Sequence, residues 1–498
     1  MKRQHPAALP GYTTKNFWLL LIPLVRGIGA LRYDAASWLR GAGWDILAVS
    51  AMILIAVVRW YFTFYSFEPD GIKIKSGVFF RTVINIPALS ISAVTSEENF
   101  ILGRLGAVRV YIDTDSASGR KKSADVSLMI QKADRARLFN ILSGAFNSRE
   151  NKGRKPKGMN CTYKASASNL IVFSLLFSSA MSGVILIMTA LSGSTDIIGD
   201  RLEREFYKAV SDVTDAVSVL MGRLISGISP AGIAVSVIIG IGFLVSFTAN
   251  IMRHLNFTVT RRGKCILVTG GSVTKRMYCL NSTRINIVDM RQNLLMKLFG
   301  VTSVHVGCTG YGKRKNELPV FVPICSIRST ESGGAKGLGA VMDRLISGFS
   351  ASESYISPKL GYIMRFIGPP ALLIFGFQLI GMAAVMVYPH WKELITFMFI
   401  LCEIPSVWLL LVKCCAYCTN GINITADSIC ARYCKGYAFH TVTVPLERVA
   451  QVRITQSFFQ KLGKSCDVHI FTSSEHIGSH RIKGLPIREV QELIRERF

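Results

Sequence analysis

The sequence predicts an α+β membrane protein in which three small antiparallel β-barrels, each capped by a C-terminal helix, alternate with pairs of transmembrane helices. Three observations predict it: the chain is apolar, it holds long apolar stretches, and one pattern of strands, turn and helix occurs three times. Half of its 498 residues are hydrophobic, the mean hydropathy is +0.36 and only 18% are charged. An ordinary soluble chain carries more charge than this.

The apolar stretches give the number of spans. A helix needs about 20 apolar residues to cross a bilayer. Four stretches clearly meet this length and a fifth meets it with Arg59 near one end; they are Leu170–Leu191, Ala231–Met252, Ile367–Tyr388, Leu394–Val412 and Trp44–Tyr65. The stretch Phe17–Leu31 is shorter and carries a proline and an arginine, so it is a strained span, a re-entrant segment or an interfacial helix. We therefore expect five or six spans.

The net charge of +27 has two possible explanations, nucleic-acid binding or basic cytoplasmic loops beside anionic lipid. Residues 66–164 contain 17 Lys and Arg against nine Asp and Glu, and residues 253–359 contain 16 against five. The loop 192–230 contains four against six. Because basic blocks alternate with apolar stretches, we place the basic blocks in the cytoplasm and expect no nucleic-acid partner.

The twelve cysteines fall mostly in these basic blocks, so we expect reduced thiols. Five of them cluster as "CCAYC" and "CARYC", between Cys414 and Cys434. Their spacing matches no zinc pattern, and the segment is interpreted as a strand hairpin, so we predict no metal site and no cofactor.

The repeat is the strongest signal in the sequence. In each copy two glycines stand 29, 29 and 27 residues apart; the pairs are Gly77 and Gly106, Gly271 and Gly300, and Gly436 and Gly463. Short alternating runs around these glycines predict half-buried antiparallel strands. Each copy closes with an amphipathic helical pattern, over residues 133–146, 335–349 and 485–498.

A ten-residue motif recurs inside each copy, as "EENFILGRLG" (97–106), "RQNLLMKLFG" (291–300) and, one residue shorter, "TQSFFQKLG" (455–463). We predict a single helical turn between two strands. Its apolar residues Leu294, Leu295 and Leu298 are expected to plug one end of the barrel, and its glycine lets the chain reverse. The alternative is that these side chains contact a partner.

These elements divide the chain into seven parts. Residues 1–65 form an N-terminal membrane segment with one or two spans, 66–148 the first barrel domain, 149–167 a basic linker, 168–252 a transmembrane pair with an external amphipathic helix over 196–226, 253–349 the second barrel domain, 350–414 a transmembrane hairpin, and 415–498 the third barrel domain.

This arrangement resembles the bacterial pleckstrin-homology-like (PH-like) family of integral membrane proteins of the YdbT/YdbS type. The resemblance is carried by Gly77, Pro87, Ile91 and Leu105-Gly106; by Gly271, Ile285, Arg291-Gln292 and Phe299-Gly300; and by Gly436, Pro445, Val449, Gln456 and Leu462-Gly463. The second copy has Asn281 in place of the proline, and the first has Glu98-Asn99 in place of the glutamine-containing pair. The resemblance implies PH-like barrels, a multi-pass protein of the bacterial inner membrane, and a role in cell-envelope maintenance or stress response.

One pair of polar residues lies within the last two spans. Glu403 sits in the middle of "FILCEIPSVWLLLV", and Gln378 lies at nearly the same depth of the preceding span. A carboxylate at that depth is a functional candidate. It is either half of a polar clasp that joins the helices, a proton or ion relay, or a group reached by water through a groove.

Two basic clusters are candidate contacts for lipid headgroups or a partner: Arg154, Lys155 and Lys157, and Lys313, Arg314 and Lys315. The alternatives are a solvated linker and a hairpin tip. We find no phosphate-binding loop, HExxH or GxSxG motif, so no catalytic residue is predicted. The predicted function is non-enzymatic: the cytoplasmic domains bind anionic membrane lipid, other membrane proteins or a second copy. The alternative is a transport or export component that uses Glu403.

Overall fold

The computed structural model describes residues 1–13, 35–78, 80–114, 126–147, 161–178, 230–311, 320–327, 355–472 and 479–497, with a few single residues between 208 and 349. The chain forms two compact units. Unit 1 comprises Met1–Tyr163, Phe257–Ile285 and Cys308–Glu317, and unit 2 comprises Lys164–Asn256, Asn286–Gly307 and Leu318–Phe498. The second copy of the repeat thus contributes its first strands to unit 1 and its later strands to unit 2.

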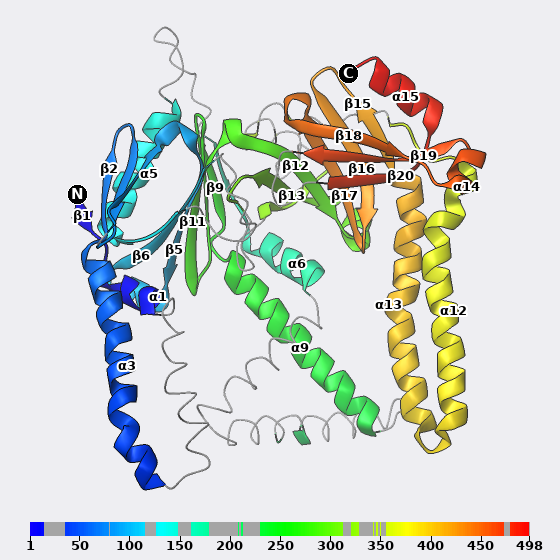
Figure 1. Cartoon of the computed structure of the whole chain (residues 1–498). Helices are drawn as coiled ribbons and strands as arrows, with labels where there is room; N and C mark the ends of the chain where they lie inside the picture. Colours follow the sequence, from blue (N-terminus) through cyan, green and yellow to red (C-terminus); the bar gives the residue numbers. More distant parts are fainter. Residues whose placement is uncertain are drawn as a thin grey trace. The chain divides into compact units, whose positions relative to one another are not determined.

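Unit 1 contains a four-stranded and a seven-stranded antiparallel sheet (Figure 1). The first has the order β1-β2-β3-β4 and consists of Lys2–Arg3, Phe64–Glu68, Gly71–Ser76 and Thr82–Pro87. The second has the order β7-β6-β5-β11-β10-β9-β8 and consists of Val126–Gln131, Ala107–Thr114, Ile91–Asn99, Thr274–Asn281, Cys265–Gly270, Thr258–Arg262 and Cys161–Lys164. Helix α5 (Lys132–Asn147) closes the first barrel, burying Leu138, Leu142 and Phe146 against both sheets.

Short helices complete unit 1. In the described part of the unit they are η1 (Pro6–Ala8), α1 (Leu9–Thr13), η3 (Ala88–Ser90), α4 (Phe100–Arg104) and η4 (Ser282–Arg284). The long helix α3 (Ala35–Tyr61) runs directly into β2.

Unit 2 contains a six-stranded sheet of order β14-β13-β12-β17-β16-β15 and a three-stranded sheet β18-β19-β20. The strands are Val320–Ser326, Val301–Cys308, Ile285–Gln292, Ala438–Pro445, Ser428–Lys435 and Gly421–Ile424, then Val449–Thr455, Ser465–Thr472 and Ser479–Pro486. Helix α15 (Ile487–Arg495) packs Val490 into the core of the third barrel. The helix expected over 335–349 lies almost wholly outside the described residues.

Besides α15, the described helices of unit 2 are α6 (Ala167–Phe177), α9 (Pro230–His254), α10 (Leu294–Leu298), α12 (Ile363–Val387), α13 (Lys392–Thr419) and α14 (Phe458–Leu462), with short η5 (Leu360–Tyr362), η6 (Pro389–Trp391) and η7 (Leu446–Arg448). Within the described residues, three segments are long and apolar enough to cross a membrane: Val235–His254, Ile363–Val387 and Pro389–Thr419. Ile46–Tyr61 and Ala167–Phe177 are shorter apolar helices. Phe17–Leu31 and most of 196–226 lie outside the described residues.

The predicted fold class is confirmed: in the described residues, antiparallel sheets with closing helices alternate with apolar helices. One local prediction was wrong. Cys414, Cys415 and Cys418 lie on α13, which continues to Thr419, and only Cys430 and Cys434 lie on a strand, β16. The apolar helical pattern of the span runs on through these cysteines, so the helix does not stop where its most apolar part ends. All twelve cysteines are free thiols.

Candidate functional site: three exposed apolar turns

The ten-residue motif forms the same turn in all three copies. Helices α4, α10 and α14 each contain five residues and begin at Phe100, Leu294 and Phe458. Each turn joins equivalent strands, which are β5 and β6, β12 and β13, and β18 and β19. We call these the three apolar turns.

The polar residues of the motif hold each turn closed. Gln292 donates from Nε2 to the Val301 carbonyl at 2.7 Å, and Gln456 makes the same bond to Ser465 at 2.6 Å. Glu98 stands at this position in the first copy, where it instead pairs with Lys132 and, at 2.8 Å, with Arg135 of α5. The glutamine-to-glutamate difference between the copies therefore changes the partner and leaves the turn intact.

Helix caps begin two of the turns, and left-handed backbone ends all three. The Asn293 side chain accepts from the Met296 amide at 2.7 Å, and Ser457 forms a capping box with Gln460. Gly106 and Gly300 have φ of +67° and +63°. In the third copy this role falls to Lys464, with φ +53°, because Gly463 has φ −86°. The expected reversal at Gly463 was therefore misplaced by one residue.

The predicted plug was wrong for most of its residues. Met296 is fully buried, against Phe173, Val320 and Ile324, whereas Leu298 is 78% exposed. The other large apolar side chains exposed on the three turns are Phe100, Ile101 and Leu105, then Leu295 and Phe299, then Phe458, Phe459 and Leu462. A helix of five residues can direct only one side chain into a barrel, so the rest point outward.

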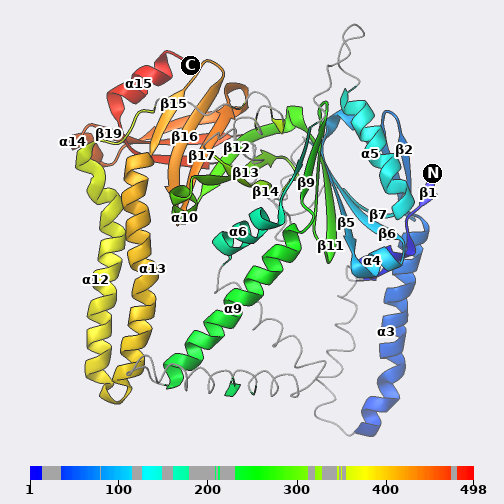
Figure 2. The ribbon, with the colours of Figure 1, turned by 180° about the vertical axis from the view of Figure 1, so that it is seen from behind.

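The first turn lies beside the end of an apolar helix. Helix α4 lies near the end of α3 that leads into β2 (Figure 2). Leu102 of α4 packs in one cluster with Trp60, one residue before the end of α3. The Arg104 guanidinium lies 4.6 Å from the centre of the Phe100 ring. This turn therefore combines exposed apolar side chains with a basic residue at a helix end.

The second turn has the same setting in unit 2. Leu294 packs against Val412 and Ala416 of α13, and Asn293 donates from Nδ2 to the Leu176 carbonyl near the end of α6, at 2.9 Å. The Lys297 ammonium lies 4.5 Å from the centre of the Phe439 ring.

The third turn, α14, lies beside the start of α12 (Figure 1). A buried carboxylate ties the two together. Asp467 on β19 accepts from Gln460 of α14 at 2.6 Å, from Arg481 at 2.8 Å and from the Gly484 amide at 3.1 Å. It also accepts from Arg365, the third residue of α12, at 3.0 Å. Burial alone would raise the pKa of Asp467, but these donors and the two guanidinium charges hold it below its usual range.

Comparison with known proteins identifies the repeat. The model of the bacterial PH domain matches residues 20–145, 213–327 and 371–497, which together make up more than half of the chain. The chain belongs to the bacterial PH domain family. It is also similar to the UPF0699 transmembrane protein YdbT of Bacillus subtilis (strain 168), with 20% identity over 459 residues, covering 89% of this chain and 85% of YdbT. No solved structure matches the chain.

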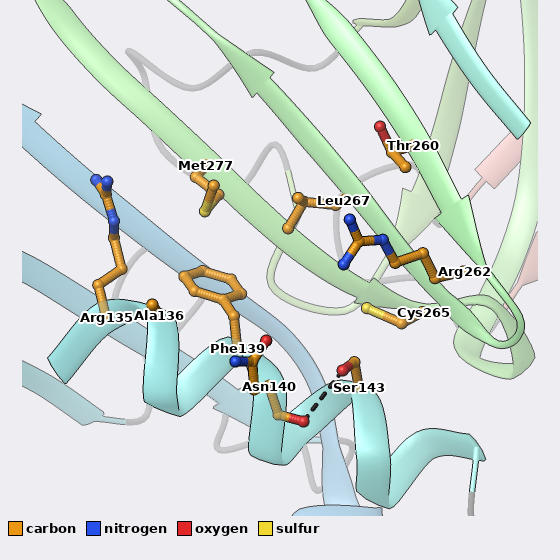
Figure 3. Close-up of a pocket in the computed structure, with 10 residues that line it drawn as sticks. All are labelled: Arg135, Ala136, Phe139, Asn140, Ser143, Thr260, Arg262, Cys265, Leu267 and Met277. Carbon is orange, nitrogen blue, oxygen red and sulfur yellow. Dashed lines mark hydrogen bonds between the residues drawn. The ribbon is translucent and has the colours of Figure 1, made fainter. Parts of the chain in front are cut away.

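Unit 1 also has a pocket, of about 230 Å³, between α5 of the first copy and the strands β9 to β11 of the second (Figure 3). Phe139 points into it from α5, opposite Met277 and Leu267. Arg262 and Cys265 line the far side, and Cys265 Sγ lies 3.0 Å from the buried Cys279 Sγ. No group of three or more His, Cys, Asp or Glu side chains that could hold a metal lies within the described ranges.

The sequence-predicted site residues divide into two sets. Both basic clusters lie outside the described residues, so their role stays a prediction; they are Arg154, Lys155 and Lys157 in the first, and Lys313, Arg314 and Lys315 in the second. Gln378 and Glu403 both line one groove of about 410 Å³ between α12 and α13. Glu403 is half-buried and Gln378 is exposed, and no hydrogen bond joins the two in the described part of the chain.

Proposed function

We propose that this bacterial PH-domain membrane protein is a non-enzymatic component of the inner membrane. In this proposal its cytoplasmic domains seat the three apolar turns in an anionic bilayer surface. The single observation that carries the proposal is the exposure of large apolar side chains at the same position of all three copies, beside a basic residue and next to an apolar helix. An apolar patch that repeats on a surface in this way marks an interaction site.

The contact energies fit a role in orientation rather than in anchoring. Full burial of one large apolar side chain contributes about 1.5–3 kcal/mol, and one basic side chain near an anionic surface contributes about 1 kcal/mol. The apolar helices already hold the protein in the bilayer. The turns therefore fix how each sheet stands on the membrane. One basic residue in each short helix, Arg104, Lys297 or Lys461, makes that contact sensitive to anionic lipid.

The test measures depth in the membrane at the turns. Spin labels are placed at Ile101, Leu298 and Phe459 of the full chain in lipid nanodiscs. Leu89 is the matched control, because it is also apolar and exposed but lies in η3, at the opposite end of β5 from α4. Oxygen, which concentrates in lipid, should broaden the spectra at the three turns, and a water-soluble nickel complex should broaden the spectrum at Leu89.

Replacing anionic lipid by zwitterionic lipid should make the turn labels more accessible to the nickel complex. If the turn labels are as accessible to nickel as Leu89 in anionic nanodiscs, the proposal is wrong.

A second function, transport, rests on the groove between α12 and α13. Gln378 and Glu403 line it together, so an ionisable group and an amide are both available within the hairpin. The Glu403→Gln variant, described below, separates this function from a polar clasp.

A further inference from the structure

Two strands of the structure have a free edge, although their counterparts elsewhere in the chain do not. Among the described strands, β4 pairs only with β3, and β18 pairs only with β19. In the repeat, β4 corresponds to β11 and β17, and β18 corresponds to β5 and β12.

Those counterparts pair with each other inside the chain. Strand β5 of the first copy pairs with β11 of the second, and β12 of the second pairs with β17 of the third, both antiparallel. The two junctions also share one register: Val94 stands opposite Cys279 in the first and Val288 opposite Thr443 in the second, and these are the same two positions of the repeat. Each copy therefore joins the next by the same edge-to-edge rule.

The burial of the strands shows that β4 of the first copy and β18 of the third lack a neighbouring strand. Strands β5, β12 and the second half of β11 are almost entirely buried. By contrast, β4 exposes Val83 at 48% and Ile84 at 38%, and Phe80 just before it is 90% exposed. Strand β18 alternates between exposed and half-buried residues. A free edge with exposed apolar side chains is a template for pairing with another strand.

We propose that β18 of one copy of this chain pairs antiparallel with β4 of a second copy. The occupant is a second copy because one chain carries both complementary halves of a junction that it already forms twice. The register of those two junctions places Val452 opposite Asn85 and Thr455 opposite Thr82. The contact is head-to-tail, so successive copies form a closed ring or an open row along the membrane.

The side chains at the new junction fit this register. Ile454 stands opposite Val83, which pairs two apolar side chains on one face. Thr455 and Thr82 stand opposite each other. In the first junction these two positions are occupied by Glu97 and Arg276, which form an ion pair at 3.0 Å. Cross-strand threonine pairs stabilise sheets, and no like charges face each other here.

The test uses cysteines in separate copies. One tagged copy carries Thr82→Cys and a differently tagged copy carries Thr455→Cys, and both are expressed in the same membrane and oxidised. A link within one chain between the new cysteines is impossible, because each copy has only one of them. We expect a linked dimer bearing both tags.

The control replaces Thr82→Cys by Val83→Cys, which points to the other face of β4, and parent chains show any background from native cysteines. The Thr82 pair should link about tenfold more than this control, because a one-residue shift turns a side chain to the opposite face. No excess over the control, or a link only to a different protein, overturns the proposal.

Charge variants give a second readout that needs no cysteine. A chain with both Thr82→Arg and Thr455→Arg places like charges opposite each other, and its assemblies in native-membrane particles should fall to single copies. Thr82→Arg with Thr455→Glu recreates the ion pair of the first junction and should keep the assemblies. If both variants have the same size distribution as the parent chain, the proposed junction is absent.

Discussion

The second apolar turn offers a direct test of which side chains belong to the core. Met296 is fully buried, whereas Leu298, two residues later on the same turn, is 78% exposed. We therefore compare Met296→Ala with Leu298→Ala in the full chain, with Met296→Leu as a control of similar volume. If the apolar residues of the turn plugged the barrel together, both alanine variants would open it.

The expected magnitudes follow from burial. Truncating a fully buried methionine costs about 2–5 kcal/mol, whereas a volume-conserving change costs less than about 1.5 kcal/mol. Leu298→Ala removes few protein contacts and should change the free energy of opening by less than about 0.5 kcal/mol. Since about 1.4 kcal/mol is a factor of ten, the Met296→Ala variant should open about 30-fold to a few thousand-fold more often.

The assay uses Cys325 as a reporter, because it is buried on β14 next to Ile324, a contact of Met296. Burial raises the pKa of the Cys325 thiol to about 12, so labelling at neutral pH requires opening. The labelling rate of the Cys325 peptide is read by mass spectrometry. Equal acceleration by Met296→Ala and Leu298→Ala would refute the assignment of Leu298 to the outer surface.

Three further predictions concern other positions. Asp467→Asn should destabilise unit 2 by about 3–5 kcal/mol at pH 7, because it leaves buried donors without a charged acceptor. The pKa of Asp467 is lowered in the folded protein, so the stabilisation by its carboxylate is present above about pH 4 and is lost as the pH falls through the folded pKa. The unfolding temperatures of the wild type and the variant should therefore converge in acid. Lys464→Gly should raise the free energy of unfolding by about 1 kcal/mol, because the φ of Lys464 is +53° and glycine adopts this conformation more easily. Gly300→Ala should lower the free energy of unfolding by at least as much. The opposite order of the two variants in denaturant titrations would contradict the turn geometry. If Glu403 is half of a polar clasp, Glu403→Gln should change the free energy of unfolding by less than about 1 kcal/mol. Loss of a growth or efflux phenotype at an unchanged protein level would instead support transport.

The sequence predicted the repeat because glycine spacing has a direct backbone meaning. Gly77, Gly106, Gly271, Gly300 and Gly436 all have positive φ, which other residues adopt at a cost. It could not predict the exposure of the three apolar turns, since an exposed leucine and a leucine covered by protein look alike in a sequence. The extent of α13 was missed for a different reason. Alternating small and apolar residues fit the end of a helix as well as they fit a strand.

The joining of sheets across copies was also beyond the sequence. A strand such as β11 has the same alternating pattern whether its second neighbour is β5 of the preceding copy or solvent. What distinguishes the cases is the burial of the edge, which depends on the partner strand and not on the strand itself. The position of Arg276 opposite Glu97 is a signal that could have been sought, because a basic strand facing an acidic one at a common offset favours pairing.

The three apolar turns share their backbone but are attached to the rest of the protein by different polar contacts. Glu98 binds α5 through Arg135, Asn293 binds the Leu176 carbonyl of α6, and Asp467 binds Arg365 of α12. If these polar contacts were the function, three unrelated attachments of the same turn, made from different positions of the repeat, would be hard to explain. They follow naturally if the common requirement is the outward apolar surface, because each copy then needs only some rigid attachment to a neighbouring helix. On this argument, a variant that breaks one attachment should loosen one turn and leave the proposed membrane contact of the other two unchanged.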